Sequence, residues 1–234
     1  MSHSTASGLP PLADLDVDGA IQETGAAVDG DTRAAFLRKA GVTGGALLAG
    51  GAFMGAVPNL ALGQSLPKGD VAILNFALTL EYLEAAFYTE AVGKKALDGS
   101  VQSLAELLAS HENTHVKTLK KVLGSKAVKK PNFDFRDTTT NSDMFLATSL
   151  ELENTGVHAY LGQAGKIQTP AILATAATIV TVEARHAAAV SLVAGNELKS
   201  KKDGITPDGP FDKPLSKGAI LKIIMDPKTT FFVK

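Results

Sequence analysis

Two Glu-x-x-His motifs, Glu112-x-x-His115 and Glu183-x-x-His186, contain the residues of this sequence best suited to chemistry. Residues three apart in a helix lie one turn apart on the same face. A carboxylate and an imidazole at this spacing can therefore reach the same metal ion. The two motifs together predict a metal site built on helices.

Each motif follows another glutamate at nearly the same distance. Glu81 lies 31 residues before Glu112, and Glu151 lies 32 residues before Glu183. In an antiparallel helical hairpin, these distances place both members of each pair at one height. The sequence therefore predicts two copies of one metal-binding hairpin. The expected metal ligands are Glu81, Glu112, His115, Glu151, Glu183 and His186.

The charges of these residues predict two metal ions. Four carboxylates that face one another in a core would repel, at a cost of several kcal/mol each if left unpaired. Two divalent cations would cancel the four negative charges. Carboxylates with one imidazole per ion suit iron, with manganese or zinc as alternatives. The sequence has no cysteine, which excludes thiolate zinc sites, iron–sulfur clusters and disulfides, so any reductant must come from another molecule.

Three further residues could support these ligands. Tyr88 and His158 each lie seven residues after an expected ligand, so either could lie two turns along the ligand face. Tyr88 could equally be a plain core aromatic, and His158 a core or surface histidine. Glu84 could be an additional ligand or part of a solvated helix face. His111 and Glu153 fall off the expected ligand face, and we assign both to solvent.

Helical periodicity from Pro67 onward predicts the elements that position these residues. Gly93 and Gly124 are suitable ends for the first two helices, and Ser100 and Asn141 can cap the second and third. Thr169-Pro170 is typical of the start of a fourth helix. Segment 124–141 is long enough to cross between two hairpins. We expect an all-α four-helix bundle of two antiparallel hairpins joined by a long crossover, with a short C-terminal helix near 219–225.

The regions outside the bundle, which we place at 64–197, have different compositions. Residues 1–31 are acidic and lack apolar content, so we expect a disordered leader. Residues 32–63 contain a basic start, an uncharged run and small residues, the order of an export signal. They resemble a twin-arginine signal in which Ala34 stands where the second arginine would be. An uncleaved membrane anchor and a buried core helix are the alternatives. Residues 198–234 form a C-terminal extension.

The six expected ligands resemble the di-iron carboxylate set of the ferritin-like superfamily, in which two helices give one Glu each and two give Glu-x-x-His. The resemblance covers about residues 67–197. Within it, segment 74–88, with the sequence LNFALTLEYLEAAFY, is similar to the opening helix of exported ferritin-like proteins related to the desiccation-related group.

The resemblance implies a di-iron protein that oxidises Fe(II) or reduces O₂ or peroxide outside the cytoplasm, in the periplasm or at or beyond the cell surface. Such an oxidase, ferroxidase or peroxidase-like protein would need an external electron donor. A manganese catalase-like protein would use the same ligands to disproportionate peroxide. A non-catalytic stress protein, in which the metal pair only stabilises the bundle, is the other alternative. A homodimer is compatible with any of these.

The overall composition fits a soluble globular protein and gives no sign of nucleic-acid binding. Hydrophobic residues make up 45% of the 234 residues and charged residues 20%. The formal net charge is −1, and the one dense basic run, 126–130, has no interleaved aromatic residues. We therefore expect metal ions and small oxidants as partners, and contact with a membrane only through an uncleaved signal.

Overall fold

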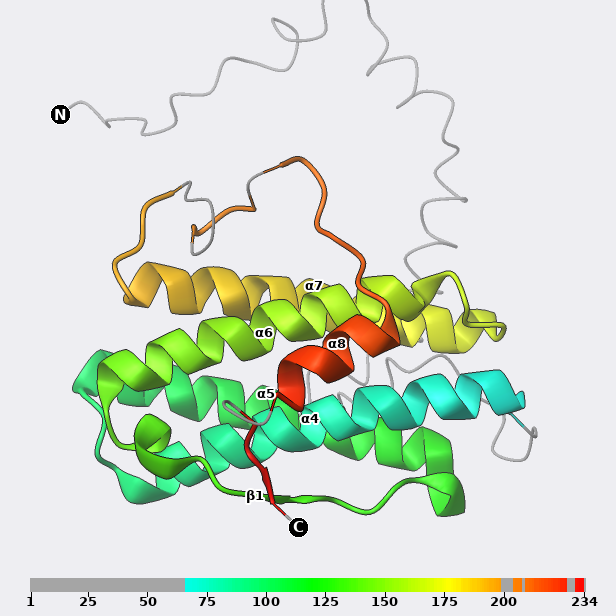
Figure 1. The fold of residues 1–234 in the computed structure, drawn as a ribbon, viewed down its shortest axis with the longest axis horizontal. Coiled ribbons are helices and arrows are strands. Elements are labelled where there is room, and N and C mark those ends of the chain that lie inside the picture. Colours follow the sequence, from blue (N-terminus) through cyan, green and yellow to red (C-terminus); the bar gives the residue numbers. More distant parts are fainter. Residues whose placement is uncertain (1–65, 199–203, 208, 227–229, 234) are drawn as a thin grey trace, which may run out of the picture. The chain divides into compact units, whose positions relative to one another are not determined.

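The computed structural model describes residues 66–198, 204–207, 209–226 and 230–233. Four long helices form two hairpins, and a short fifth helix packs against them (Figure 1). The all-α prediction is therefore confirmed, while the expected leader and export signal at 1–31 and 32–63 lie outside the described residues. The helices are α4 (Lys68–Lys94), α5 (Gly99–Leu123), α6 (Ser142–Ala164), α7 (Pro170–Val193) and α8 (Lys217–Ile224).

The helix ends follow local sequence at most of the predicted positions. Gly124 ends α5 with a positive φ of 55°, a conformation that glycine adopts without steric cost. The side chain of Asn141 accepts a hydrogen bond from the Met144 backbone N–H at the start of α6. Helix α4, however, continues past Gly93 and ends at Lys94, because Lys95 takes the left-handed conformation there.

The crossover between the hairpins has little regular structure of its own. It contains the short 3₁₀ helices η2 (Gly124–Lys126) and η3 (Arg136–Thr139) and the two-residue strand β1 (Asn132–Phe133). This strand pairs in antiparallel register with β2 (Phe232–Val233) near the C-terminus. The C-terminal extension therefore returns to the crossover and pairs with it, as Figure 1 shows.

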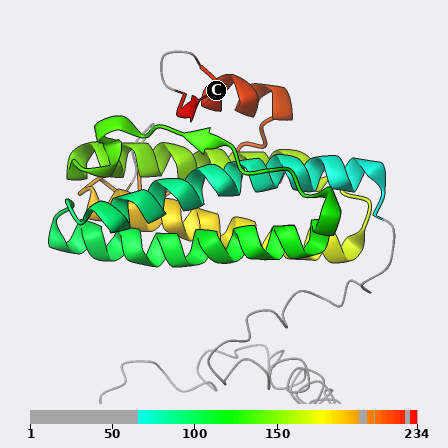
Figure 2. The ribbon, with the colours of Figure 1, turned by 90° about the horizontal axis from the view of Figure 1, so that it is seen from below.

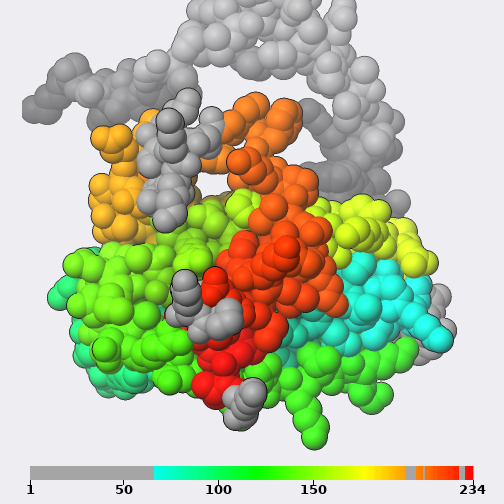
Figure 3. All heavy atoms as spheres, in the orientation of Figure 1, coloured from blue at the N-terminus to red at the C-terminus, as the bar shows by residue number. Residues whose placement is uncertain are grey.

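Helix α8 covers the seam between α4 and α6. Its buried residues Ile220 and Ile224 join the apolar cluster that also contains Phe76 and Leu80 of α4 and Leu150 of α6. Figure 2 shows α8 on the side of the bundle away from α5 and α7, and in Figure 3 its atoms lie between those of α6 and α4. The helices that carry the Glu-x-x-His motifs are therefore on the opposite side from α8.

Two separate apolar clusters form the core. One gathers aromatic side chains, including Phe87 stacked on Phe145 with ring centroids 5.2 Å apart, and includes Tyr88. The other contains Leu78 and Tyr160. By length and composition alone α4 and α7 could each cross a membrane. In α4 67% of that stretch is buried inside the protein, and in α7 39%.

A buried aspartate fixes one end of the bundle. Asp70, in the first turn of α4, is fully buried. Its two carboxylate oxygens accept hydrogen bonds from the backbone N–H groups of Gln168 (2.8 Å) and Thr169 (2.9 Å). Since Thr169 immediately precedes α7, this contact holds the start of α4 against the start of α7.

Candidate metal centre

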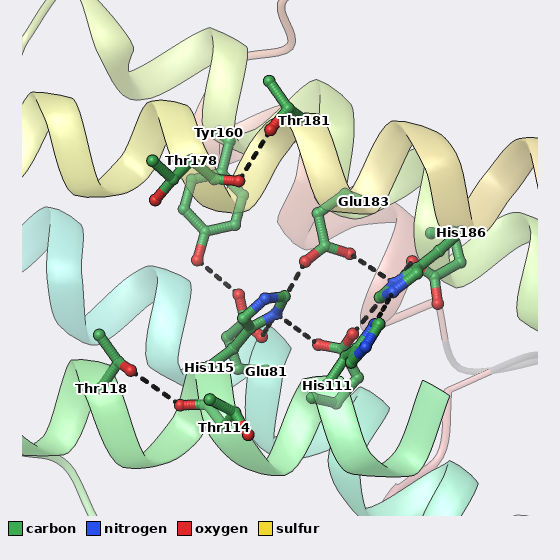
Figure 4. Close-up of polar contacts among 12 residues, drawn as sticks. Glu81, His111, Thr114, His115, Thr118, Tyr160, Thr178, Thr181, Glu183 and His186 are labelled. Carbon is green, nitrogen blue, oxygen red and sulfur yellow. Dashed lines mark hydrogen bonds and ion pairs between the residues drawn. The ribbon is translucent and has the colours of Figure 1, made fainter. Parts of the chain in front are cut away.

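Six buried side chains meet between the four long helices (Figure 4). All four carboxylates are fully buried, while the two imidazoles keep a small exposed fraction of 9% and 4%. Each long helix contributes at least one of them. The six residues are Glu81 of α4, Glu112 and His115 of α5, Glu153 of α6, and Glu183 and His186 of α7.

The six residues form two overlapping groups of four. In the first group, three carboxylates surround the imidazole of His115. Its Nδ1 lies 3.2 Å from Glu81 Oε2, 3.0 Å from Glu112 Oε2 and 3.0 Å from Glu183 Oε1. Three carboxylate oxygens thus converge on one ring nitrogen. A single N–H can donate fully to only one of them.

The second group surrounds His186 in the same manner. Its Nδ1 lies 3.1 Å from Glu112 Oε1, 3.2 Å from Glu153 Oε2 and 3.9 Å from Glu183 Oε2. Glu112 and Glu183 therefore turn one oxygen toward each histidine. Glu81 serves the first group alone and Glu153 the second.

The donor set fits two metal ions. Glu81 Oε2, Glu112 Oε1 and both oxygens of Glu183 are buried without a well-formed hydrogen bond, although each faces an imidazole at ion-pair distance. Buried carboxylate oxygens left in this condition are costly unless a cation neutralises them. Each group offers three carboxylates and one imidazole, and two carboxylates are shared. This arrangement could hold a metal pair, with Glu112 and Glu183 common to both groups.

When no cation is bound, protons take its place. Burial lowers the pKa of His186, but hydrogen bonds to Glu112 and Glu153 outweigh it and raise that pKa to about 10. Burial likewise opposes the effect of Glu81 and its neighbours on His115, whose pKa rises well above its usual range. Burial raises the pKa of Glu81 to about 7. Because metal ions bind the deprotonated ligands, loading the centre would release these protons.

Two tyrosines hold the outer carboxylates across the bundle. Tyr160 of α6 donates to Glu81 Oε1 of α4 at 2.5 Å, and Tyr88 of α4 donates to Glu153 Oε1 of α6 at 2.6 Å. Each hydroxyl binds one oxygen and leaves the other directed at a histidine. Tyr88, for which the sequence allowed a supporting role or a plain core position, lies in an apolar cluster and donates to Glu153.

The sequence predicted Glu151 as a metal ligand and Glu153 in solvent, and both predictions were wrong. Glu151 is exposed on the outer face of α6, whereas Glu153 is fully buried in the cluster. Two residues of a helix differ by only about 3 Å in height but by about 200° in direction. Counting residues from the loops gives the position of a ligand along the bundle axis. It does not give the side of the helix on which the ligand lies. The buried surface of α6 is also wide, because α8 and η3 pack on it as well as α7.

His111 and Glu84 do not lie in solvent, and His158 takes its alternative position as a histidine outside the ligand set. His158 lies seven residues after Glu151 and is half-buried on the same outer side, where both border a hollow beside the C-terminal extension, away from the cluster. His111 is half-buried, and its Nδ1 lies 2.8 Å from Nε2 of His186 rather than in solvent. Glu84 is buried, with 3% of its surface exposed, and lies beside the cluster.

A repeat in the sequence could have identified Glu153 and Tyr160. Glu81 is followed seven residues later by Tyr88, and Glu153 is followed seven residues later by Tyr160. Glu151 has His158 at that position. Searching for the pair of glutamate and tyrosine, instead of glutamate alone, would have selected the buried residue.

The fold and the cluster agree with the comparison to known families. A family model for the ferritin-like domain matches residues 69–196, which include all four long helices except the first residue of α4. The chain belongs to this ferritin-like family. No curated protein matches the sequence. The family and the buried cluster together define a ferritin-like protein with groups that could bind a metal pair.

Proposed function

We propose that this protein binds two iron ions and uses them to oxidise Fe(II) or to reduce O₂ or peroxide. The observation that carries the proposal is the convergence of buried carboxylate oxygens on the Nδ1 atoms of His115 and His186, with Glu112 and Glu183 shared. Carboxylate and imidazole donors in this ratio suit iron. Manganese and zinc are the alternative metals.

An iron pair would supply the redox chemistry: two Fe(II) give two electrons, which with two protons reduce one O₂ to H₂O₂. The residues of this chain hold and shield the centre. Tyr88 and Tyr160 fix the outer carboxylates, and two apolar clusters keep bulk water away. Because the four carboxylates are fully buried, the proposed substrates are as small as Fe(II), O₂ and peroxide. In Fe(II) oxidation the substrate supplies the electrons. Repeated reduction of O₂ or peroxide by a resident iron pair would require an external electron donor, since the chain has no thiol that could supply them.

Metal analysis and an Fe(II) titration test this proposal. Protein purified from its own source should contain two irons per chain, and anaerobic addition of Fe(II) should saturate at two equivalents. Exposure to air should then produce the absorption of oxidised iron together with O₂ consumption. Two manganese ions per chain and O₂ evolution from peroxide would instead favour a catalase-like reaction. A chain that binds no metal would contradict both.

A second candidate is a non-catalytic stress protein of the desiccation-related type. The cluster takes residues from α4, α5, α6 and α7, so a bound metal pair would tie all four helices together. A ligand that binds only the folded state raises its stability. This candidate predicts that metal raises the melting temperature while no turnover occurs with Fe(II), O₂ or peroxide.

We also propose that the protein acts outside the cytoplasm, on the strength of the basic, uncharged and small-residue order of segment 32–63. Determining the N-terminus of the native protein tests this. A mature chain that begins near residue 64 supports export, and an intact N-terminus at Met1 or Ser2 on a soluble protein contradicts it.

A further inference from the structure

The two halves of the centre repeat one another with the same residue spacings. In both halves an outer glutamate is followed after seven residues by a tyrosine, and a shared glutamate is followed after three residues by a histidine. Differences between the two metal positions must therefore come from residues that break this repeat. The paired residues are Glu81 with Glu153, Tyr88 with Tyr160, Glu112 with Glu183, and His115 with His186.

Glu84 is the first residue that breaks the repeat. It lies three residues after Glu81, whereas the residue three after Glu153 is Gly156. A Cβ at Gly156 would stand 3.3 Å from Glu84 Oε1 and 3.6 Å from Glu183 Oε2, which is the oxygen that faces His186. The missing side chain on α6 thus leaves the space that the fifth carboxylate uses.

Glu84 has no partner of its own in the described part of the chain. It is buried, and neither a hydrogen bond nor an ion pair joins it to another described residue. Its Oε1 and Glu183 Oε2, the oxygen that faces His186, both approach the place of the missing Cβ at Gly156. The unpartnered carboxyl therefore lies beside the second group.

His111, beside the cluster, also breaks the repeat. It precedes Glu112, whereas Val182 precedes Glu183. Because Nδ1 of His186 faces the carboxylates, Nε2 would carry the proton in a metal-bound centre and donate a hydrogen bond to Nδ1 of His111, 2.8 Å away. Such a partner fixes the tautomer of a metal-binding histidine and increases its basicity. Within the described residues, Nε2 of His115 has no equivalent partner.

We propose that the two metal positions are unequal, and that the position formed with Glu153 and His186 binds a divalent cation first and more tightly. Glu84 adds a carboxylate on that side, and His111 is a positioning residue for His186. The tyrosine contacts and the shared carboxylates occur at both metal positions, so they contribute no difference in affinity between them. The expected difference in affinity is roughly 10- to 100-fold, the size of a typical outer-shell effect. This inference rests on the metal centre proposed above.

Two adjacent cations repel each other, so even two identical positions would fill in unequal steps. The number of binding steps alone is therefore no test. An unequal centre is recognised by which carboxylate controls the binding of the first, tighter ion. Removing Glu81 and removing Glu153 should have the same effect at a symmetric centre and different effects at this one.

The experiment is a titration of the metal-free protein with Co²⁺, followed by visible absorption and calorimetry. In Glu81→Gln the tight step, binding of the first Co²⁺ ion, should remain. The weak step, binding of the second ion, should be lost. In Glu153→Gln the tight step should weaken at least tenfold. Equal effects of the two substitutions would overturn the inference and leave the metal centre standing. If the unmutated protein binds no Co²⁺, the proposed metal centre itself is overturned.

Three further variants test the residues that cause the asymmetry, and each should fold since none removes a core side chain. Glu84→Gln and His111→Ala should each weaken the tight step while leaving the weak step unchanged. His111→Gln, which keeps a hydrogen-bond acceptor, should restore part of the affinity. His158→Gln, at a half-buried histidine outside the cluster, is the matched control and should bind Co²⁺ like the unmutated protein. If Glu84→Gln or His111→Ala changed only the weak step, the assignment of these residues to the tighter metal position would be wrong.

Discussion

Tyr160 of α6 donates a 2.5 Å hydrogen bond to Glu81 of α4, across the bundle between two helices that are not joined by a loop. Its counterpart runs in the opposite direction, from Tyr88 of α4 to Glu153 of α6. Each hairpin therefore supplies the tyrosine that orients the outer carboxylate of the other. The cluster depends on both hairpins being docked, and neither alone contains the complete set of oriented carboxylates.

Tyr160→Phe should weaken metal binding without unfolding the bundle. The substitution keeps the ring in its apolar cluster and removes only the hydroxyl that holds Glu81. We expect metal affinity to fall roughly 10- to 100-fold, as is typical for loss of an outer-shell hydrogen bond. Tyr82→Phe, which removes a hydroxyl 3.4 Å from the Val128 carbonyl, is the control and should leave metal affinity unchanged.

Glu153→Ala and Glu151→Ala should have opposite consequences although the residues are two apart. Loss of the buried Glu153 would remove a proposed metal ligand and should reduce bound metal from two ions to one or none. Loss of the exposed Glu151 should leave two ions bound. Elemental analysis of both variants after metal loading is the measurement. Loss of metal from the Glu151 variant would restore the assignment made from spacing alone.

The metal-free protein should lose stability as pH rises. The pKa of Glu81 goes from 4.5 to about 7 on folding, and that of His186 from 6.5 to about 10. Groups with a raised pKa stabilise the folded state fully below their unfolded pKa, and that contribution is lost as pH passes the folded pKa. Lowered pKa values act in the opposite sense, that of Glu112 near and below 4.5 and those of the half-buried His111 and His158 near and below 6.5.

The melting temperature in the presence of a chelator should therefore fall between about pH 4.5 and pH 10. With metal bound, cations replace the protons, and the same scan should be flatter. A melting temperature of the chelated protein that rises over this range would contradict the assignment of protons to the cluster.

Asp70→Ala should destabilise the bundle without changing its metal content. The substitution leaves the backbone N–H groups of Gln168 and Thr169 without their carboxylate acceptor. Hydrogen bonds to charged groups contribute about 1.5–3 kcal/mol each, so we expect a loss of at least about 2 kcal/mol in the free energy of unfolding. Asp143→Ala, at an exposed position in the first turn of α6, is the comparison and should cost less than about 1 kcal/mol.

Gly162→Ala should displace the C-terminal extension from α6. A Cβ at this position would stand only 1.7 Å from the backbone oxygen of Leu215, whose N–H binds the carbonyl of His158. Backbone cannot yield to such an overlap, so the segment that leads into α8 must move. Limited proteolysis should cut the variant before α8 faster than the unmutated protein. Gly165→Ala, which meets no atom within 4 Å, should be cut at the original rate.

The sequence by itself determined the helical fold and most of the candidate centre. Periodicity, caps and the doubled Glu-x-x-His motif located all four long helices and five of the six clustered residues, because those patterns are local properties of single helices. It also set the composition of the donor set, carboxylate and imidazole without thiolate.

Only the tertiary structure decided which face of α6 is inside, and with it the choice of Glu153 over Glu151. Helix α6 is covered by α7, α8 and η3, so its buried surface is too wide for a single apolar stripe to mark the ligand direction. The same packing brings His111 to His186 and seats Glu84 against Gly156. These contacts join residues on different helices, and their distances depend on how the hairpins dock, which no spacing along the chain specifies.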